Sequence, residues 1–271
     1  MPLNKPQSRQ LTVLITGATS GVGYQLTLDY LASGANVIAI GRNVAQLVDL
    51  QQLGADTICC DLTDERAVAT SCLELARRYA AIDVLILNAG VCHYVDDGQL
   101  KTSVLQQTLD INVVAPVRLL ENLSDLLSSS PDAKVAFIGS ASVYLPFARA
   151  EFYGASKAAL QYLAHVLHNT LAPREIKVTN VMLGFIDTPL TQKNDFDMPM
   201  LASTQAASAA IRAGVEKGKA EVHFPRLFCG VLRLIHKLPV SARLWLASKL
   251  NQPSRRSNGH QTPQHKDLSN L

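Results

Sequence analysis

Tyr153 and Lys157 stand one helical turn apart and could together move a proton. A free tyrosine, with a pKa of ~10, is a poor base at neutral pH. The i,i+4 spacing places both side chains on one helix face, where the Lys157 ammonium would stabilise a tyrosinate and lower its pKa. Such a pair could protonate the alkoxide that develops when a carbonyl is reduced, or deprotonate an alcohol that is being oxidised. Because this pair is common on helices, the prediction needs further residues.

Ser140 and Asn112 are the residues that could complete such a site. Ser140 lies 13 residues before Tyr153, at the end of an apolar run predicted to be a strand. Ligands of open α/β sheets bind at the carboxyl ends of strands, so its hydroxyl could orient a substrate oxygen. Asn112 stands in an otherwise apolar helical stretch, which costs stability unless its amide is hydrogen-bonded. A functional role is therefore the favoured interpretation of Asn112.

A glycine-rich segment near the N-terminus has the pattern of an anion-binding loop. An apolar run, 11–16, leads into Thr16-Gly17-Ala18-Thr19-Ser20-Gly21-Val22-Gly23, and a helical pattern begins there. Glycines allow a tight turn and let the backbone approach a pyrophosphate at a helix N-terminus, whose amides and dipole favour anions. The strand before and the helix after favour a dinucleotide site over a plain turn.

The spacing T-G-x-x-x-G-x-G differs from the commoner G-x-G-x-x-G, and with it the sequence resembles the short-chain dehydrogenase/reductase family from residue 11 to about 224. Further motifs follow in that family's order: Asp61-Leu62, Asn88-Ala89-Gly90, Asn112, Ser140 and Tyr153-Gly154-Ala155-Ser156-Lys157. The resemblance implies that Asp61 holds the adenine and that 88–90 line the ribose side of the cofactor. It also implies that Lys157 holds the nicotinamide ribose, while Asn112 holds a water that relays protons to Lys157. Two alternatives are weaker: Asn88 as a strand-end cap, and Ser142, whose spacing of 11 residues from Tyr153 departs from the family pattern.

The end of the second predicted strand, Ile40-Gly41-Arg42-Asn43, indicates which cofactor binds. An NAD site needs a carboxylate there to accept from the ribose 2′-hydroxyl, whereas a 2′-phosphate needs a cation. Gly41 stands where the family's NAD-selective acid would be, and Arg42 follows it. NADP(H) is therefore favoured over NAD(H), the alternative being a solvated Arg42 that caps the strand.

The loop after the sixth predicted strand begins Leu183-Gly184, where the family usually has Pro-Gly. Ile186 and Thr188 match family positions that meet the nicotinamide carboxamide. The resemblance thus implies this set of cofactor-binding residues: Gly17, Thr19, Ser20, Gly21, Val22, Gly23, Arg42, Asp61, Leu62, Asn88, Ala89, Gly90, Tyr153, Lys157, Gly184, Ile186 and Thr188.

Apolar residues near the predicted catalytic group indicate the kind of substrate. Two segments should overhang the nicotinamide, namely Leu145-Pro146-Phe147 and 185–202, the second with Phe196, Met198, Pro199, Met200 and Leu201. Such a lining is apolar and adaptable, which favours a lipophilic carbonyl or secondary alcohol. The alternative is that these residues only pack the loop on the core.

Short apolar runs that alternate with longer helical patterns must position these residues. The predicted strands are 11–16, 36–41, 56–60, 82–88, 134–139, 176–182 and 220–224, and the predicted helices are 22–32, 43–53, 64–80, 101–128, 153–171 and 203–217. This alternation is typical of a parallel sheet wrapped by helices. We therefore expect an α/β fold: one Rossmann-like, doubly wound parallel sheet of about seven strands with helices on both faces.

Composition bounds the function further. The chain has 271 residues, of which 48% are hydrophobic, and a net charge of only +3, which argues against a dedicated nucleic-acid binder. The odd set of five cysteines without a C-x-x-C pair favours reduced thiols, and no signal peptide is visible before residue 11, so we expect a cytoplasmic protein. His165 and His168 are interpreted as part of an ordinary helix face, with no metal site.

The C-terminal part of the chain has a different charge. Residues 1–221 carry 17 basic and 21 acidic side chains, hence −4, whereas 222–271 carry eight basic and one acidic, hence +7. We divide the chain into a dinucleotide-binding and catalytic domain (1–224), an apolar and basic helical extension (225–250) and a polar, disordered tail (251–271). Along 227–238, Leu227, Val231, Leu234, Ile235 and Leu238 share one helix face, and Arg226, Arg233 and Lys237 share another. A helix of ~18 Å is too short to span a bilayer but suits its surface, the alternatives being a lid or a dimer contact.

Together these features predict an NADP(H)-dependent oxidoreductase that interconverts a carbonyl and a secondary alcohol by hydride transfer. Helices 101–128 and 153–171 resemble those that pair in this family, so a homodimer or homotetramer is expected. The alternative from another class is a non-catalytic, NADP(H)-sensing regulatory protein on the same fold. The presence of all four candidate catalytic residues disfavours it.

Overall fold

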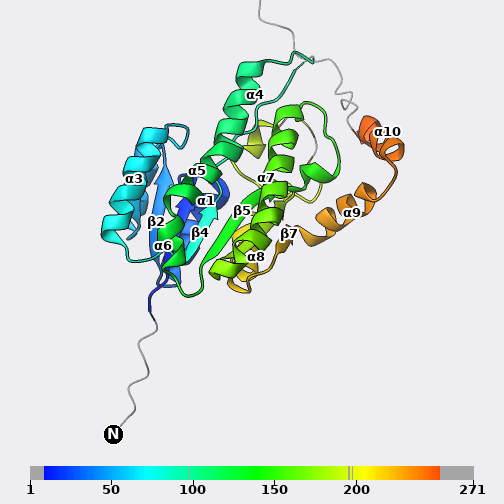
Figure 1. Ribbon diagram of the computed structural model, residues 1–271. Coiled ribbons are helices and arrows are strands. Elements are labelled where there is room, and N and C mark those ends of the chain that lie inside the picture. The colour runs from blue at the N-terminus through cyan, green and yellow to red at the C-terminus, as the bar shows by residue number, and fades with distance from the viewer. Residues whose placement is uncertain (1–8, 97, 195, 197, 251–271) are drawn as a thin grey trace, which may run out of the picture.

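The computed structural model describes residues 9–96, 98–194, 196 and 198–250 and contains one seven-stranded sheet (Figure 1). Every strand pairs in parallel with its neighbours, in the order β3-β2-β1-β4-β5-β6-β7. The strands are β1 (Thr12–Thr16), β2 (Asn36–Gly41), β3 (Asp56–Cys59), β4 (Val84–Leu87), β5 (Lys134–Ser140), β6 (Lys177–Leu183) and β7 (Glu221–Phe224). The predicted fold class and all seven predicted strands are confirmed.

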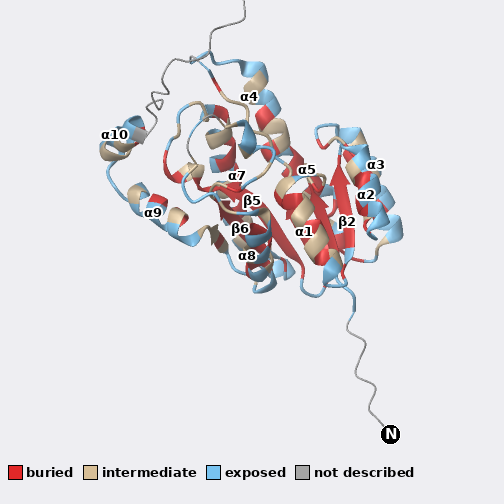
Figure 2. Ribbon diagram, turned by 180° about the vertical axis from the view of Figure 1, so that it is seen from behind, coloured by how far each residue is buried: buried red, intermediate tan, exposed pale blue. Residues whose placement is uncertain are grey.

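Helices cover both faces of the sheet. They are α1 (Gly21–Ala32), α2 (Val44–Gln52), α3 (Glu65–Arg78), α4 (Thr102–Leu109), α5 (Ala115–Asn122), α6 (Ser124–Ser128), α7 (Glu151–Thr170), α8 (Thr204–Glu216), α9 (Arg226–His236) and α10 (Val240–Leu250). One core cluster joins the sheet to α3, α5, α6 and α7, and a second joins it to α1 and α8. Figure 2 shows the strands buried between these layers, as continuous apolar strands of a parallel sheet should be.

The predicted single helix 101–128 is wrong, because the structure divides it. A π-helical segment, η1 (Asp110–Val114), separates α4 from α5, and α5 ends before α6 at Leu123. Pro116 in the first turn of α5 has no N–H, so it cannot donate to the carbonyl four residues earlier, and a regular helix is interrupted there. The interruption is where Asn112 lies, and single π-turns are frequent at functional sites.

The strand order reverses between β1 and β4, and this reversal positions the site. Chain connections run outward from β1 to β2 and β3, and then outward on the other side from β4 to β7. Ligands of open α/β sheets bind in the crevice outside the carboxyl ends of the strands at such a reversal. The glycine loop after β1, the segment after β4, and Ser140 at the end of β5 all lie at this edge.

The last two described helices pack at the same edge of the sheet. A third apolar cluster joins α9 and α10 to β6 and to the short 3₁₀ helix η2 (Ala141–Tyr144), through Met182, Cys229, Leu232 and Ala247. Within the described residues, no helix combines the length and the apolar character needed to cross a bilayer. The division at 224/225 stays a prediction, and the predicted tail 251–271 lies outside the described residues.

Candidate active site

The structure brings the four predicted catalytic residues together. Ser140 is the last residue of β5, and its Oγ accepts a hydrogen bond from the Ser142 backbone N–H at 3.2 Å. Tyr153 lies in the first turn of α7 and shares a side-chain hydrogen bond with Ser140. The Lys157 Nζ lies 5.7 Å from the centre of the Tyr153 ring. Ser140, and not its competitor Ser142, is thus the serine that meets the tyrosine.

The expected lowering of the Tyr153 pKa is not seen in the protein alone. Burial of the hydroxyl raises the pKa of Tyr153 to about 12, while the hydrogen bond from Ser140 acts in the opposite direction. Lys157 makes no contribution to this shift, because its Nζ is directed elsewhere. It donates to the Ile138 carbonyl oxygen at 2.8 Å. In this state the tyrosine is held protonated, as an acid for carbonyl reduction must be.

Lys157 is itself perturbed by its surroundings. The side chain is buried, and desolvation lowers the pKa of its ammonium to about 8. The Cys92 thiol acts in the opposite direction and raises the pKa of Lys157, by less than burial lowers it. A lysine with a pKa near 8 changes its charge within the pH range in which an enzyme works.

Asn112 is fully buried and hydrogen-bonded on both sides of its amide. Its Oδ1 accepts from the Val91 N–H at 2.8 Å, and its Nδ2 donates to the Val91 carbonyl at 3.0 Å and to the Ser156 Oγ at 2.9 Å. These hydrogen bonds compensate for the loss of water contacts on burial of the amide, as the sequence led us to expect. Asn112 therefore ties the segment after β4 to α7, the helix that carries Tyr153 and Lys157.

The glycine loop forms a cavity with the segments that follow β4 and β6, here termed the glycine-loop cavity. Its lining includes Gly17, Ser20, Gly21, Val22, Asn88, Ala89, Gly90, Tyr153, Lys157, Gly184, Ile186 and Thr188. A side-chain carbon on Gly23 would lie 2.2 Å from the Gly17 carbonyl oxygen, so only glycine allows α1 to begin this close to the loop. This cradle of backbone groups at a helix N-terminus fits the pyrophosphate of a dinucleotide.

Asn88 serves the architecture as well as the cavity. Its Nδ2 donates to the Thr16 and Gly17 carbonyls at 3.0 and 3.3 Å, and the Thr16 Oγ1 accepts from the N–H groups of Asn88 and Ala89. The strand-end role and the cavity-lining role are therefore filled by the same residue. Thr16 is the partner that sequence reasoning did not single out, although it stands directly before the first glycine.

A second cavity continues the first past the end of β2, here termed the Arg42 cavity. It shares Gly17, Ser20, Ala89 and Gly90 with the glycine-loop cavity and adds Thr19, Gly41, Arg42, Cys60 and Leu62. Gly41 is required by a close approach, because a side-chain carbon there would lie 2.4 Å from the Thr19 Cγ2. The place of an NAD-selective acid is thus filled by Thr19.

Asp61 lies beside this cavity but does not line it. Its carboxylate accepts from the backbone and hydroxyl of Thr63 and pairs with Arg42 at 3.5 Å. Hydrogen bonds from Thr63, followed by the nearby Arg42 charge, hold the pKa of Asp61 below its usual range. Leu62 and Cys60 line the cavity next to it, and the adenine contact expected of Asp61 stays a prediction.

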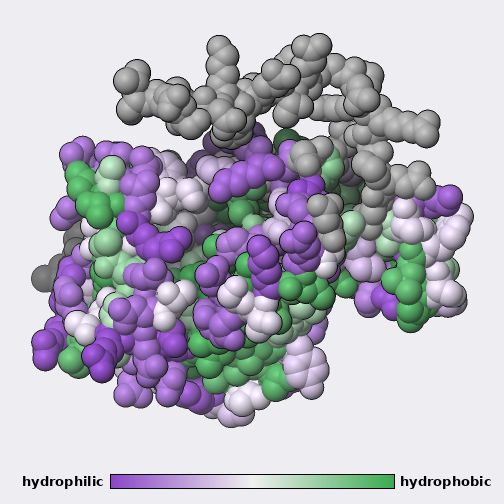
Figure 3. All heavy atoms as spheres, turned by 90° about the horizontal axis from the view of Figure 1, so that it is seen from above, coloured by the Kyte–Doolittle hydropathy of each residue, from purple (hydrophilic) through white to green (hydrophobic). Residues whose placement is uncertain are grey.

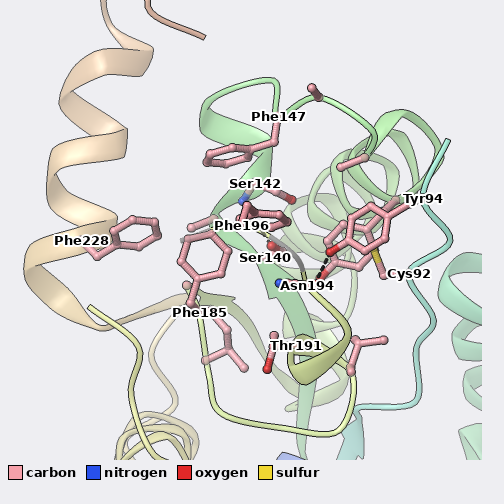
Figure 4. A pocket seen from close by; sticks show the side chains of 17 residues that line it. Cys92, Tyr94, Ser140, Ser142, Phe147, Phe185, Thr191, Asn194, Phe196 and Phe228 are labelled. Carbon is pink, nitrogen blue, oxygen red and sulfur yellow. Dashed lines mark hydrogen bonds between the residues drawn. The ribbon is translucent and has the colours of Figure 1, made fainter. Parts of the chain in front are cut away.

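A third cavity adjoins the glycine-loop cavity at Tyr153 and is here termed the aromatic pocket. Ser140 and Tyr153 line it together with the rings of Tyr94, Phe147, Phe185, Phe196 and Phe228. Figure 4 shows these five rings around Ser140. Phe185 is central among these rings. The centre of its ring lies 5.4 Å from the ring centre of Phe228, 6.0 Å from that of Phe196 and 6.4 Å from that of Phe147. The Tyr94 ring meets Phe196 edge to face, and its hydroxyl donates to the Asn194 Oδ1 (Figure 4).

The predicted substrate lining is correct only in part. Phe147, Phe185 and Phe196 line the aromatic pocket, whereas Leu145 is buried in the third core cluster. Met200 and Leu201 are exposed, and neither lines the pocket. Sequence reasoning missed Cys92, Tyr94 and Phe228, and it did not single out Asn194 within the predicted segment 185–202. Cys92 and Tyr94 follow Asn88-Ala89-Gly90 within four residues, a signal that could have found them, but no pattern connects Phe228 to the site.

The two histidines one turn apart lie away from these cavities. His165 Nε2 contacts the Glu221 carboxylate at 2.8 Å, and His168 Nδ1 contacts the Val178 carbonyl at 2.9 Å. In the described part of the chain, no group of three or more His, Cys, Asp or Glu side chains is placed to hold a metal ion.

Comparison with known proteins is consistent with this geometry. The family model for short chain dehydrogenases matches residues 11–198. An uncharacterized oxidoreductase of Myxococcus xanthus is 28% identical over 234 residues, which cover 84% of this chain and 92% of that protein. The dehydrogenase/reductase SDR family member 7B of Xenopus laevis is 32% identical over 193 residues, covering 66% of this chain and 59% of its own length.

Solved structures show the same fold. A short-chain dehydrogenase from Streptomyces avermitilis superimposes with a TM-score of 0.78 at 25% identity, covering 89% of this chain and 97% of its own. One from Sphingobium yanoikuyae, solved in complex with NADPH, superimposes with a TM-score of 0.74 at 23% identity, covering 92% and 99%. With the family match spanning most of the sequence, the chain belongs to the short-chain dehydrogenase/reductase family and is an oxidoreductase that acts on CH–OH and C=O groups with NAD(P).

Proposed function

We propose that the protein is an NADP(H)-dependent oxidoreductase that interconverts a lipophilic carbonyl and its secondary alcohol. The observation that carries this proposal is the position of Tyr153, which lines both the glycine-loop cavity and the aromatic pocket. A proton donor at the junction of a dinucleotide cavity and an apolar pocket is what carbonyl reduction requires. When bound, NADP(H) supplies the hydride in reduction and accepts it in oxidation.

Each of the four residues has a distinct proposed task. Ser140 donates to the substrate oxygen and holds it beside the Tyr153 hydroxyl, which gives up its proton to the developing alkoxide. Lys157, already directed toward the Ile138 carbonyl at the edge of the glycine-loop cavity, holds the cofactor ribose and favours the tyrosinate once it is charged. Asn112 Oδ1 has a second lone pair that can accept from a water, which would return a proton through Lys157.

The preference for NADP(H) rests on the end of β2. A side-chain carbon at position 41 would lie 2.4 Å from the Thr19 Cγ2, so a carboxylate there, the usual acceptor for a ribose 2′-hydroxyl, would require Thr19 to move. The Arg42 side chain is 69% exposed at the rim of its cavity, where it can meet a 2′-phosphate. Its pairing with Asp61 is long and exposed, so it is weak enough to be exchanged for a phosphate.

The proposed substrate is lipophilic because the surface of the pocket is mainly apolar. Five aromatic rings, Leu183 and Leu190 line it, and its polar lining residues are Ser140, Ser142, Tyr153, Thr191 and Asn194. The Asn194 Oδ1 is already engaged by Tyr94. Transfer of an apolar body into such a pocket is favourable by roughly 25 cal/mol for each Å² of apolar surface buried.

A homodimer or homotetramer is proposed from a separate surface. Val114, Val117, Tyr162 and Val166 are all exposed on η1, α5 and α7, beside an apolar hollow between α5 and α7. A symmetric pairing of these helices would bury them. A monomeric mass by light scattering at micromolar protein would contradict this oligomer.

We further propose a cytoplasmic location, which the five free cysteines support.

The test of the proposed function is a screen of lipophilic ketones and alcohols with NADPH, NADH and their oxidised forms, followed by nicotinamide absorbance. Turnover of apolar ketones with NADPH, at rates well above those for small polar ketones, is the expected result. Calorimetry on the same protein measures cofactor binding independently. Binding of NADPH without turnover across the panel would instead support the sensing protein, and turnover with NADH alone would contradict the cofactor assignment.

A further inference from the structure

Helix α9 has two apolar faces, and only one of them is covered. Cys229 and Leu232 are buried against η2 and β6. On the opposite side an apolar stripe of Leu227, Val231, Leu234 and Leu238 follows the spacing i, i+4, i+7, i+11 along the helix and its end. Leu227 is 66% exposed and Leu234 is 68% exposed. In Figure 2 the ribbon of α9 accordingly alternates between buried and exposed residues.

The next helix also exposes large apolar side chains. Val240, Leu244 and Trp245 of α10 are exposed, Trp245 to 60% of its surface. Seen from above, the end of the molecule that carries α10 presents apolar residues beside hydrophilic ones at its outer surface, at the right of Figure 3. Several large apolar side chains gathered on one exposed surface mark an interaction site more often than isolated ones do.

The charges beside this stripe have one sign. Arg226, Arg233 and Lys237 on α9 and Lys249 on α10 are exposed, and the sequence has no acidic residue from 222 to 266. An apolar stripe flanked by cations is complementary to a surface that presents apolar chains beneath anionic groups. The partner therefore needs apolar chains and anionic groups on the same surface.

We propose that α9 and α10 bind the surface of a membrane that contains anionic lipids. The stripe and Trp245 enter the boundary between headgroups and acyl chains, and the basic side chains pair with lipid phosphates. Each helix has 11 residues, or ~16 Å at 1.5 Å per residue, so it lies in the surface instead of crossing it.

Two other occupants fit the stripe less well. A second copy of this chain would bring the same cations face to face, which is unfavourable without an anionic counterpart. The C-terminal residues 251–271 contain three basic side chains against one acidic and only two aliphatic ones, Leu268 and Leu271. That segment offers neither the charge nor the apolar surface that the stripe would require.

This location would also bring the aromatic pocket close to the lipid. Phe228 projects from α9 into the pocket. Its ring packs against Gly184 so closely that a side-chain carbon on Gly184 would lie 2.6 Å from the Phe228 Cδ1. The helix that meets the membrane is thus also a wall of the pocket. Resting on the proposed function, this arrangement would let a lipophilic substrate pass from the bilayer to Tyr153.

The chain contains a single tryptophan, Trp245, which reports directly on this surface. The experiment mixes the full-length protein at low salt with vesicles of phosphatidylcholine alone, or of phosphatidylcholine and phosphatidylglycerol. Sedimentation measures the bound fraction, and Trp245 emission measures insertion. We expect binding and a blue shift with the anionic vesicles only, both reversed by high salt.

A double variant and a control variant sharpen the test. Leu227→Ser with Leu234→Ser removes apolar surface from the stripe and should weaken partitioning about tenfold or more. The matched control is Leu73→Ser, which changes a leucine that is similarly exposed on α3, and it should bind as the parent does. Protein that stays in the supernatant with unchanged Trp245 emission, or that self-associates through the stripe without lipid, would overturn the proposal. Because the assay needs no turnover, either result leaves the oxidoreductase function to be judged separately.

Discussion

The glycine-loop cavity and the aromatic pocket meet at Tyr153 but are built from different materials. The glycine-loop cavity is made largely of backbone and small residues at the ends of β1, β4 and β6. The aromatic pocket is made of large side chains from widely separated segments, Tyr94 after β4, Phe147 before α7, Phe185 after β6 and Phe228 in α9. The first is fixed by the sheet, and the second by loops and by a helix that follows the sheet.

This difference determines which substitutions each of the two cavities tolerates. Where backbone segments approach within contact distance, an added carbon atom is costly and few residue types are allowed. Where large side chains pack edge to face, one ring can be removed and the pocket keeps its other walls. Substitutions in the two halves should therefore differ in kind, with cofactor binding lost in one and substrate affinity changed in the other.

The largest effect on cofactor binding is expected from Gly23→Ala. The new methyl group would meet the Gly17 carbonyl oxygen at 2.2 Å and the Asn88 Nδ2 at 2.5 Å, so the glycine loop must move. Overpacking of this kind typically costs 1–3 kcal/mol, and a cost at the upper end of this range would raise the Kd for NADPH about 100-fold. Gly230→Ala is the matched control, because a carbon added there meets nothing within 4 Å. Calorimetric titration with NADPH measures both, and unchanged binding by the first variant would contradict the role given to the loop.

Arg42→Asp should have the next largest effect, on selectivity more than on affinity. The variant loses the cation proposed to meet a 2′-phosphate and places a carboxylate next to Asp61. A hydrogen bond to a charged group contributes about 1.5–3 kcal/mol, so the ratio of Kd for NADPH to Kd for NADH should rise by roughly 10- to 100-fold. Arg66→Asp on α3, an exposed arginine outside these cavities, is the control. An unchanged ratio would leave Arg42 as a surface residue only.

A smaller effect is expected from Phe185→Ala in the aromatic pocket. Loss of the central ring removes contacts with Phe147, Phe196 and Phe228, and KM for a lipophilic ketone should rise about tenfold while NADPH affinity stays the same. Leu201→Ala, in an exposed residue of the same loop, should leave KM unchanged. Steady-state kinetics at saturating NADPH would separate the two. Equal effects of both substitutions would mean that the pocket has been assigned to the wrong residues.

The most gradual effect is expected with pH. The pKa of Lys157 is lowered to about 8, so its charge is lost as the pH rises through that value, whereas Tyr153, at about 12, stays protonated. Reduction should therefore decline above pH 8, by about tenfold per pH unit once Lys157 is neutral. The measurement is kcat/KM for NADPH, which reports groups of the free enzyme. A profile that stays level to pH 10 would show that the Lys157 charge is not required.

The same linkage predicts how stability changes. Because unfolded Lys157 keeps its proton up to its ordinary pKa of about 10.5 while the folded form releases it near 8, the unfolded state binds more protons between these values. Lys157 therefore disfavours the folded state below pH 8, and its contribution to the free energy of unfolding becomes less unfavourable as the pH rises toward 10.5. Tyr153 acts in the opposite sense between pH 10 and 12.

The sequence predicted the backbone-built half far better than the side-chain-built half. The strands, the glycine loop and the spacing from Ser140 to Lys157 are local patterns. The strands are confirmed, and the structure places the glycine loop and these residues at the edge of the sheet. Phe228 enters the aromatic pocket only because α9 folds back onto η2, which is a tertiary contact without a local signal. The break at η1 was likewise missed, although Pro116 marks the place.

The central claim is that Tyr153 connects a cofactor cavity to a substrate pocket as a proton donor. Tyr153→Phe keeps the ring and removes only the transferable proton. Parallel measurement of the Kd for NADPH and of kcat with a lipophilic ketone tests the claim most directly. We predict that Kd stays within about twofold while kcat falls by roughly 10²- to 10⁴-fold. A kcat within a few-fold of the parent would contradict the claim.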